Sequence, residues 1–176
     1  MTSADASSHH RNGEGAYVSL NGMICWARTM SGSEGIQQCG GQSRFPPSNE
    51  DAVPVTGCSV TLSGSGIKPL TVRVWTNLDS TKDESFGISN FAIDSDKTVT
   101  TLSLADAFPI TANFEDSKDP EGWNCGKITT CGKYGNICGG YDVKTGGDEI
   151  KKTFMLPAGD TYWVTMDFIA IDSWFA

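Results

Sequence analysis

The stretch from Thr161 to Trp174, which reads TYWVTMDFIAIDSW, decides the fold. Over its first half the large apolar residues recur at every second position, which places them on one face of a pleated strand. These residues are Tyr162, Val164, Met166 and Phe168. From Ile169 to Ile171 apolar residues occupy both faces, as in a strand that is covered on both sides. We therefore expect a long strand in the middle of a sheet, with Trp163 on the face opposite the apolar one.

Shorter strand patterns separated by turn-forming residues fill much of the remaining chain. Asn21-Gly22 joins two apolar runs within residues 16–28, which indicates a β-hairpin because both residues tolerate the positive φ of a type I′ turn. Further strands are expected at 58–62, 69–78, 86–93, 150–156 and 161–171. Residues 98–104 suit an edge strand or a linker, and residues 31–57 and 126–147 have the Gly and Pro content of loops.

No segment has apolar residues at helical spacing, so little helix is expected. The chain has 176 residues, 38% of them apolar, and contains 20 glycines. These properties predict a single all-β domain, a two-sheet antiparallel β-sandwich of the jelly-roll or Ig-like type.

The six cysteines indicate an oxidising, extracellular compartment and a sandwich stapled by disulfides. They are Cys25, Cys39, Cys58, Cys125, Cys131 and Cys138. Zinc is the competing explanation, but the spacing is wrong for a zinc knuckle and no histidine lies near. Three cysteines precede residue 60 and three follow residue 120, so complete pairing requires at least one bridge between the two halves. We expect Cys25 and Cys39 to form a local pair.

Charge and terminal composition narrow the possible partners. The formal net charge of -8 argues against nucleic acid and anionic membrane surfaces, and no stretch is long and apolar enough for a membrane span. Residues 1–15 are expected to form a flexible arm without the apolar core of a signal peptide. A secreted chain would then have lost a leader or would be a piece of a larger protein.

Two groups of motifs resemble a secreted β-sandwich repeat found in large extracellular proteins of ciliates and other protists. One is DESFGISNFAI at 83–93, preceded by the strand LTVRVWTNLD at 70–79. The other comprises TCGKYGNICGGY at 130–141, IKKTFMLP at 150–157 and FIAIDSW at 168–174. In the family the Ile-Asp-Ser-Trp motif precedes an Asn/Asp-Gly turn and a tryptophan strand. Here that continuation, residues 12–26, stands at the other end of the chain.

The resemblance implies a permuted arrangement of half-repeats. Residues 1–15 form the arm, 16–95 the second half of a repeat, 96–112 a linker or an edge or donor strand, and 113–176 the first half of a repeat. The halves can close within one chain, can complete the halves of neighbouring molecules, or can reflect a cut through a repetitive precursor. We expect a structural subunit of an extracellular filament or surface appendage that assembles head to tail with itself.

The alternative function is a monomeric carbohydrate-binding or adhesion module, with glycans as partners. Tryptophans in strands usually pack in a core or anchor an interface, and Trp163 is the best surface candidate. The residues expected at the joint between subunits are Tyr17, Tyr162, Trp163, Phe168, Ile171 and Trp174.

Carboxylates provide the only candidate metal site, which is one for Ca²⁺. Asp79, Asp83 and Glu84 share one turn, and the family order would bring Asp172 beside Glu14 at another. Asp and Glu also cap turns of the backbone, which is the competing explanation. Both histidines, His9 and His10, lie in the arm, and nothing fixes a pair of carboxylates for glycoside hydrolysis, so we expect no enzyme activity.

Overall fold

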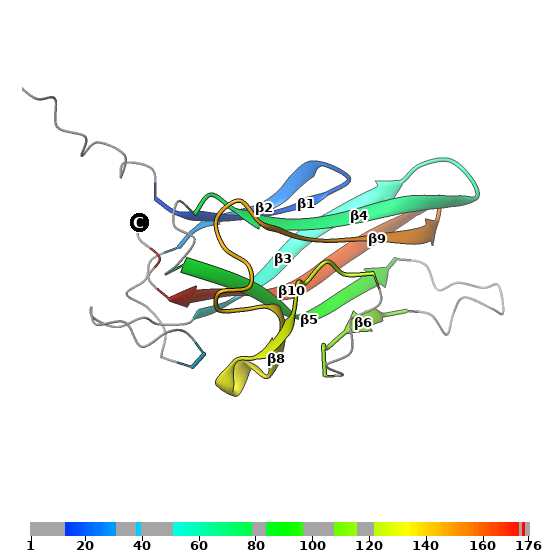
Figure 1. The fold of residues 1–176 in the computed structure, drawn as a ribbon. Helices are drawn as coiled ribbons and strands as arrows, with labels where there is room; N and C mark the ends of the chain where they lie inside the picture. Colours follow the sequence, from blue (N-terminus) through cyan, green and yellow to red (C-terminus); the bar gives the residue numbers. More distant parts are fainter. Residues whose placement is uncertain are drawn as a thin grey trace, which may run out of the picture.

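The computed structural model describes residues 13–30, 38–39, 51–78, 84–96, 108–115, 122–172 and 174. These residues form two antiparallel sheets packed face to face (Figure 1). The four-stranded sheet has the order β2-β1-β4-β9, and the six-stranded sheet has the order β3-β10-β5-β8-β7 with β6 also paired to β5. The strands are β1 Gly15–Leu20, β2 Met23–Thr29, β3 Asp51–Leu62, β4 Ile67–Thr76, β5 Glu84–Ser95, β6 Ile110–Ala112, β7 Ile128–Thr130, β8 Asn136–Gly139, β9 Glu149–Pro157 and β10 Asp160–Asp172. The predicted all-β sandwich is confirmed.

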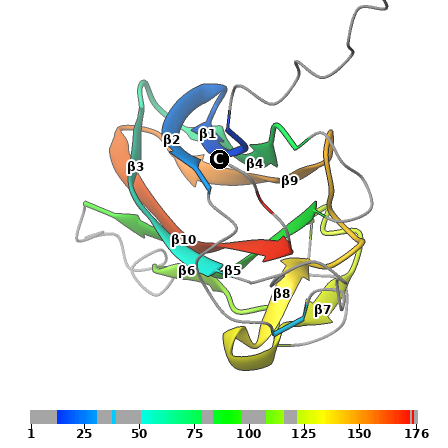
Figure 2. The same ribbon diagram turned by 90° about the vertical axis from the view of Figure 1, so that its left-hand side faces the viewer.

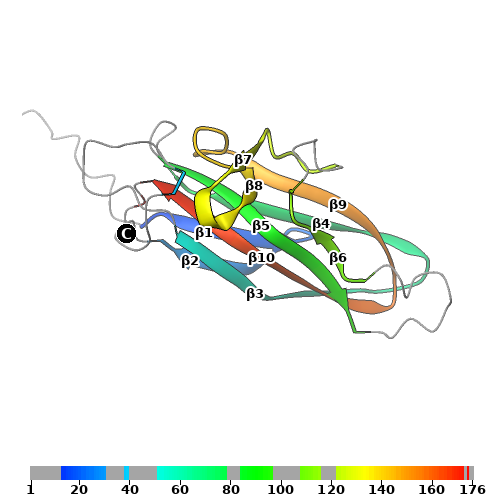
Figure 3. The ribbon, with the colours of Figure 1, turned by 90° about the horizontal axis from the view of Figure 1, so that it is seen from below.

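Strand β10 is the centre of the six-stranded sheet, as its sequence predicts. It pairs with β3 along one edge and with β5 along the other, and the three strands run side by side in Figure 3. Its alternating apolar side chains all point into the space between the sheets and are buried; these are Tyr162, Val164, Met166 and Phe168. This row supplies much of the core against which the four-stranded sheet packs.

The apolar pair at the end of β10 has a separate explanation. Ile169 and Ile171 point away from the main core and are fully buried in a second cluster with Cys131 and Ile137. The segment around β7 and β8 covers this part of the outer face. The strand is therefore apolar on both sides where it is covered on both sides.

The turn between β1 and β2 confirms the predicted hairpin. Asn21 and Gly22 have φ values of 48° and 84°. The Asn21 side chain also accepts a hydrogen bond from the Thr71 N–H at 2.8 Å and donates one to the Pro69 carbonyl at 3.2 Å. The turn is thus held against β4, which is the next strand of the sheet.

Two segments predicted as loops contain strands. Strand β3 begins at Asp51, because Val53 and Val55 continue the buried side of its alternation. Pro54 is tolerated within it because β3 lies at the edge of its sheet. Between 126 and 147, β7 and β8 form a small antiparallel pair around the 3₁₀ turn Gly132–Tyr134.

Strand β8 reaches the sheet because β5 has a glycine at the contact. A Cβ on Gly87 would lie 2.9 Å from Ile137 Cδ1 and 3.0 Å from the Cys138 carbonyl oxygen. Such distances leave no room for a side chain. Glycine in a strand often marks a close approach of this kind.

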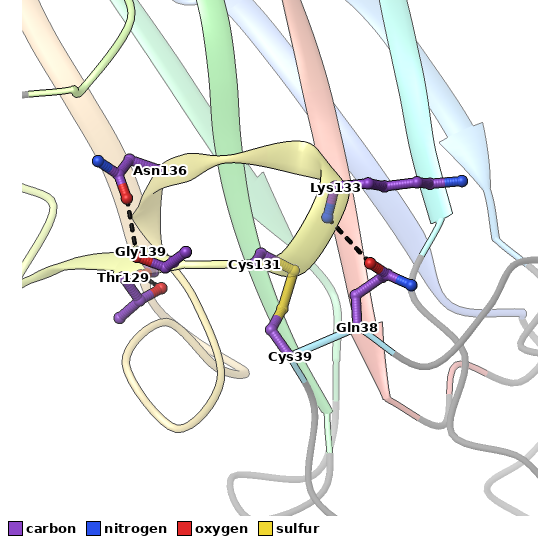
Figure 4. The surroundings of a disulfide bond; sticks show 8 residues. Gln38, Cys39, Thr129, Cys131, Lys133, Asn136 and Gly139 are labelled. Atoms are coloured by element: carbon purple, nitrogen blue, oxygen red, sulfur yellow. Dashed lines mark hydrogen bonds between the residues drawn. A yellow bond between two sulfur atoms is a disulfide. The ribbon is translucent and has the colours of Figure 1, made fainter.

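The disulfide pairing differs from the expected local loop. Cys25 pairs with Cys58, Cys39 with Cys131, and Cys125 with Cys138, so the predicted Cys25–Cys39 pair is wrong. Cys25 on β2 and Cys58 on β3 meet because these strands lie beside each other at one side of the sandwich (Figure 2). The expectation of a bridge between the two halves is confirmed by Cys39–Cys131 (Figure 4).

The two halves of the chain pack on each other. Strand β10 inserts between β3 and β5, and β9 pairs with β4, so both long strands of the second half lie beside strands of the first. The segment expected as linker, 96–112, contains β6 at its end, while residues 97–107, including the predicted strand 98–104, lie outside the described residues. This pairing corresponds to the first of the three arrangements that the sequence leaves open, and completion by a neighbouring molecule stays a prediction.

Candidate interaction surfaces

The outer face of the six-stranded sheet presents Trp163. Its side chain projects from near the start of β10, away from the core, and is 38% exposed. In the register, Ser59 of β3 and Asp94 of β5 lie on either side of it. Among the described residues no aromatic ring packs on this indole. A large aromatic side chain is therefore exposed between neighbours whose side chains are small or polar.

The outer face of the four-stranded sheet carries a cluster of aromatic and charged side chains. Tyr17 and Trp75 are cross-strand partners, and their rings stack with centroids 5.5 Å apart. The Arg73 guanidinium carbon lies 4.5 Å from the centroid of the Trp75 ring, which is a cation–π contact. The aromatic pair and the arginine thus form one packed row across β1 and β4.

Glu149 links this row to the neighbouring strand β9. Arg73 Nε donates to one carboxylate oxygen of Glu149 at 2.5 Å, and Lys151 Nζ donates to the other at 2.7 Å. The hydrogen bond from Lys151, with that from Arg73 and the positive charges of both, lowers the pKa of Glu149. Both cations remain substantially in water, with side chains 46% exposed.

A surface pocket of about 520 Å³ lies beside this cluster. It contains an apolar wall from Ile24 and Trp75, and the cation Arg73 stands at its side. The lining residues are Ser19, Asn21, Gly22, Ile24, Thr71, Arg73 and Trp75. Ile24 is 59% exposed, so the pocket is partly formed by an apolar side chain that the fold itself does not cover.

Charge is divided between the two sheets. The described strands of the six-stranded sheet contain no Lys or Arg, and their acidic residues are Asp51, Glu84, Asp94, Asp160, Asp167 and Asp172. The strands of the four-stranded sheet contain the single acid Glu149 and the cations Arg28, Lys68, Arg73, Lys151 and Lys152. The strands of one sheet are therefore acidic in composition and those of the other are basic. Of the six acids, Glu84, Asp160 and Asp172 are buried, so Asp51, Asp94 and Asp167 are the ones within reach of a partner.

The residues expected at a joint between subunits fall into two groups. Tyr162, Phe168, Ile171 and Trp174 are buried by residues of their own chain. The Trp174 indole N–H donates to the Ser85 carbonyl at 3.1 Å and to the Ile171 carbonyl at 3.2 Å. By contrast, Trp163 is exposed and Tyr17 is half-buried, and they lie on opposite outer faces.

The expected calcium ligands are only partly brought together. Glu84 and Asp172 are cross-strand partners on β5 and β10, and both are buried. Glu14 is buried just before β1, where its carbonyl accepts the Met30 N–H. Asp79, Asp83, His9 and His10 lie outside the described residues. Within the described ranges no group of three or more metal-ligating side chains occurs, and calcium binding stays a prediction.

The cluster of Arg73, Trp75 and Glu149 was missed at the level of sequence. Its signal is the outward half of the alternation in residues 69–78, where Thr71, Arg73 and Trp75 face away from the core. The partner Glu149 could not be found in this way, because it is 76 positions from Arg73 along the chain.

Comparison with protein-family models, with curated proteins and with solved structures finds no match. In the part of the chain that the structure describes, no helix has the length and apolar character needed to cross a membrane.

Proposed function

We propose that this chain is a non-enzymatic structural subunit of an extracellular filament or surface appendage, built head to tail from identical copies. The supporting observation is that accessible charges of opposite sign lie on the two sheets, with Asp94 and Asp167 on one and Arg73 and Lys151 on the other. The outer faces of these sheets point in opposite directions (Figure 1). The three disulfides are compatible with the oxidising compartment that this function requires.

Two unlike faces favour a heterologous contact between copies. The exposed carboxylate of Asp94 on one face can attract the cations Arg73 and Lys151 on the other face of the next molecule, and each copy then keeps one free face of either kind. A heterologous contact that does not close into a ring generates an open filament. Charge complementarity speeds such encounters and disfavours like faces meeting.

Copies can join either by exchanging halves or by stacking as closed sandwiches, and the strand pairing distinguishes these two routes. Strand β10 is paired along both edges within its own chain, so it offers no open edge to a donor strand. Complementation between chains would need exchange of whole halves, in which β9 and β10 leave their own β4, β3 and β5 for those of a neighbour. Stacking of closed sandwiches needs no such exchange, and we favour it.

The first experiment tests assembly itself. Purified full-length chain is followed over a range of concentration by light scattering coupled to size-exclusion chromatography, and by negative-stain microscopy. We expect polymers that lengthen with concentration and dissociate in high salt, because salt screens contacts between exposed charges. A chain that stays monomeric at millimolar concentration in low salt contradicts the proposed function.

The second experiment identifies the route from the disulfides. Cys39–Cys131 is the only bridge joining the two halves, and exchange of halves would make it an interchain bond. Polymers formed by stacking should run as monomers on a denaturing gel without reductant, after free thiols are blocked. A ladder of covalent oligomers that reductant collapses would instead demonstrate exchange of halves.

The exposed indole of Trp163 favours a second candidate, a monomeric carbohydrate-binding or adhesion module. Aromatic rings flanked by hydroxyl and carboxylate groups are suited to bind sugars, and Ser59 and Asp94 flank this one. A glycan array should then show binding that Trp163→Ala abolishes and Thr165→Ala retains. If adhesion depends on calcium, EDTA should lower the melting temperature, since a ligand of the folded state stabilises it.

A further inference from the structure

We infer that Trp163 of one copy seats in the pocket beside Trp75 on the four-stranded sheet of the next copy, with Asp94 meeting Arg73. This inference rests on the proposed filament and specifies its repeating contact. It predicts which side chains each face contributes and allows the two faces to be disabled separately.

The donating face presents the exposed side chain of Trp163, called the knob below, with a carboxylate residue next to it. Trp163 stands near the start of β10, where its register partner Asp94 lies beside it on the same face of the sheet. Asp94 is exposed, and one of its carboxylate oxygens accepts the N–H of Ser95 at 2.8 Å. Tryptophan is enriched among residues that dominate binding energy, particularly where a ring of polar groups surrounds it.

The receiving face has the matching chemistry. Ile24 and Trp75 provide apolar and aromatic surface for an indole, and aromatic pairs add attraction beyond the area they bury. Arg73 uses its Nε for Glu149, and no other hydrogen bond of its guanidinium is made to the described residues. A guanidinium has five N–H donors, so its terminal nitrogens can bind the incoming Asp94 while Glu149 stays in place.

The two faces are compatible in one molecule because they belong to different sheets. Trp163 projects from β10 on the outside of one layer, and the pocket opens on β1, β2 and β4 on the outside of the other. Figure 2 shows the sheet of β1, β2 and β4 on one side of the molecule and β10 in the other sheet. A copy can therefore donate its knob and accept another at the same time. This is the geometry of an open heterologous chain.

Two single variants separate the faces. Trp163→Ala removes the knob and leaves the pocket, whereas Ile24→Glu places a charge in the pocket wall and leaves the knob. Both positions are exposed, so the fold should survive, which circular dichroism and thermal melting will verify. Matched controls are Thr165→Ala, on the same face of β10, and Met155→Glu, an exposed residue of the four-stranded sheet outside the pocket.

We expect each face variant to raise the concentration needed for assembly by at least about tenfold, and each control to assemble like the natural chain. An equimolar mixture of the two face variants should form a one-to-one heterodimer and nothing longer, because only one intact knob and one intact pocket can meet. The charge exchange Asp94→Arg with Arg73→Asp in one chain should assemble better than either single change.

The possible failures are distinguishable. If the natural chain polymerises and Trp163→Ala polymerises equally well, the insertion of Trp163 into the pocket is refuted, while the proposed filament is not. If both face variants stay monomeric but their mixture forms no heterodimer, the seating is also overturned. A natural chain that never polymerises refutes the proposed function itself, and the seating with it.

Discussion

At the scale of single residues, Tyr162 shows how the core of the sandwich controls a titratable group. Its ring is buried between the sheets, and its hydroxyl donates to the Pro157 carbonyl at 2.8 Å. Burial, together with the negative charge of Asp160, raises the pKa of this hydroxyl above its ordinary value near 10. The folded protein therefore holds this proton at pH values where the unfolded chain releases it.

The sign of the resulting pH dependence follows from linkage. Above pH 10 the unfolded chain binds fewer protons than the folded one, so stability falls as pH rises toward the folded pKa. The loss from this single group is at most about 1.4 kcal/mol per pH unit. Urea unfolding between pH 9 and about 11 should show this fall in the natural chain and a shallower one in Tyr162→Phe. Equal slopes in the two proteins would show that Tyr162 does not cause the loss of stability at high pH.

At the scale of elements, strand β10 concentrates the packing of the core on one row of side chains. Phe168 is fully buried, and its ring lies 5.8 Å from that of Phe86, 5.7 Å from that of Trp174 and 6.1 Å from that of Trp26. These partners come from β5, from the end of the chain and from the opposite sheet. The ring thus joins both sheets and both halves.

Truncation on the two faces of β10 should have very different costs. Phe168→Ala leaves a cavity among three rings and should destabilise the fold by about 3–5 kcal/mol. Thr165→Ala lies on the exposed face of the same strand and should change stability by less than about 0.5 kcal/mol. Urea titration measures both. Similar effects at the two positions would contradict the assignment of the faces.

At the scale of the whole molecule, the disulfides close loops of different length. Cys39–Cys131 spans 92 positions and joins the two halves, whereas Cys125–Cys138 spans 13 positions within one half. A longer closed loop removes more conformational entropy from the unfolded chain. Cys39–Cys131 should therefore contribute more to stability, even though it lies outside the main core.

Replacing each pair by serine tests this difference. By the loop-entropy relation, Cys39→Ser with Cys131→Ser should cost about 4–5 kcal/mol, and Cys125→Ser with Cys138→Ser about 3 kcal/mol. Guanidinium unfolding of the two double variants, with the other bridges intact, gives the comparison. The reverse order would show that local packing around Cys125 and Cys138 outweighs loop length.

Prediction from the sequence succeeded where local pattern carries the information. The alternation of β10 and the Asn21-Gly22 turn each depend on residues that are neighbours in sequence, and both were found. Prediction failed where an element depends on a distant partner. The pair β7–β8 is short and rich in glycine, and it gains its place through the contact of Ile137 and Cys138 with Gly87.

The sequence by itself determined an all-β chain, a central β10, a hairpin at the start, and at least one disulfide between the halves, because periodicity, turn chemistry and parity are properties of the linear order. Only the tertiary structure decided which cysteines pair, that β10 lies between β3 and β5 of its own chain, and that acidic and basic strands are sorted into different sheets. These features depend on which strands become neighbours. That choice is made by long-range packing of the two sheets, which no local pattern encodes.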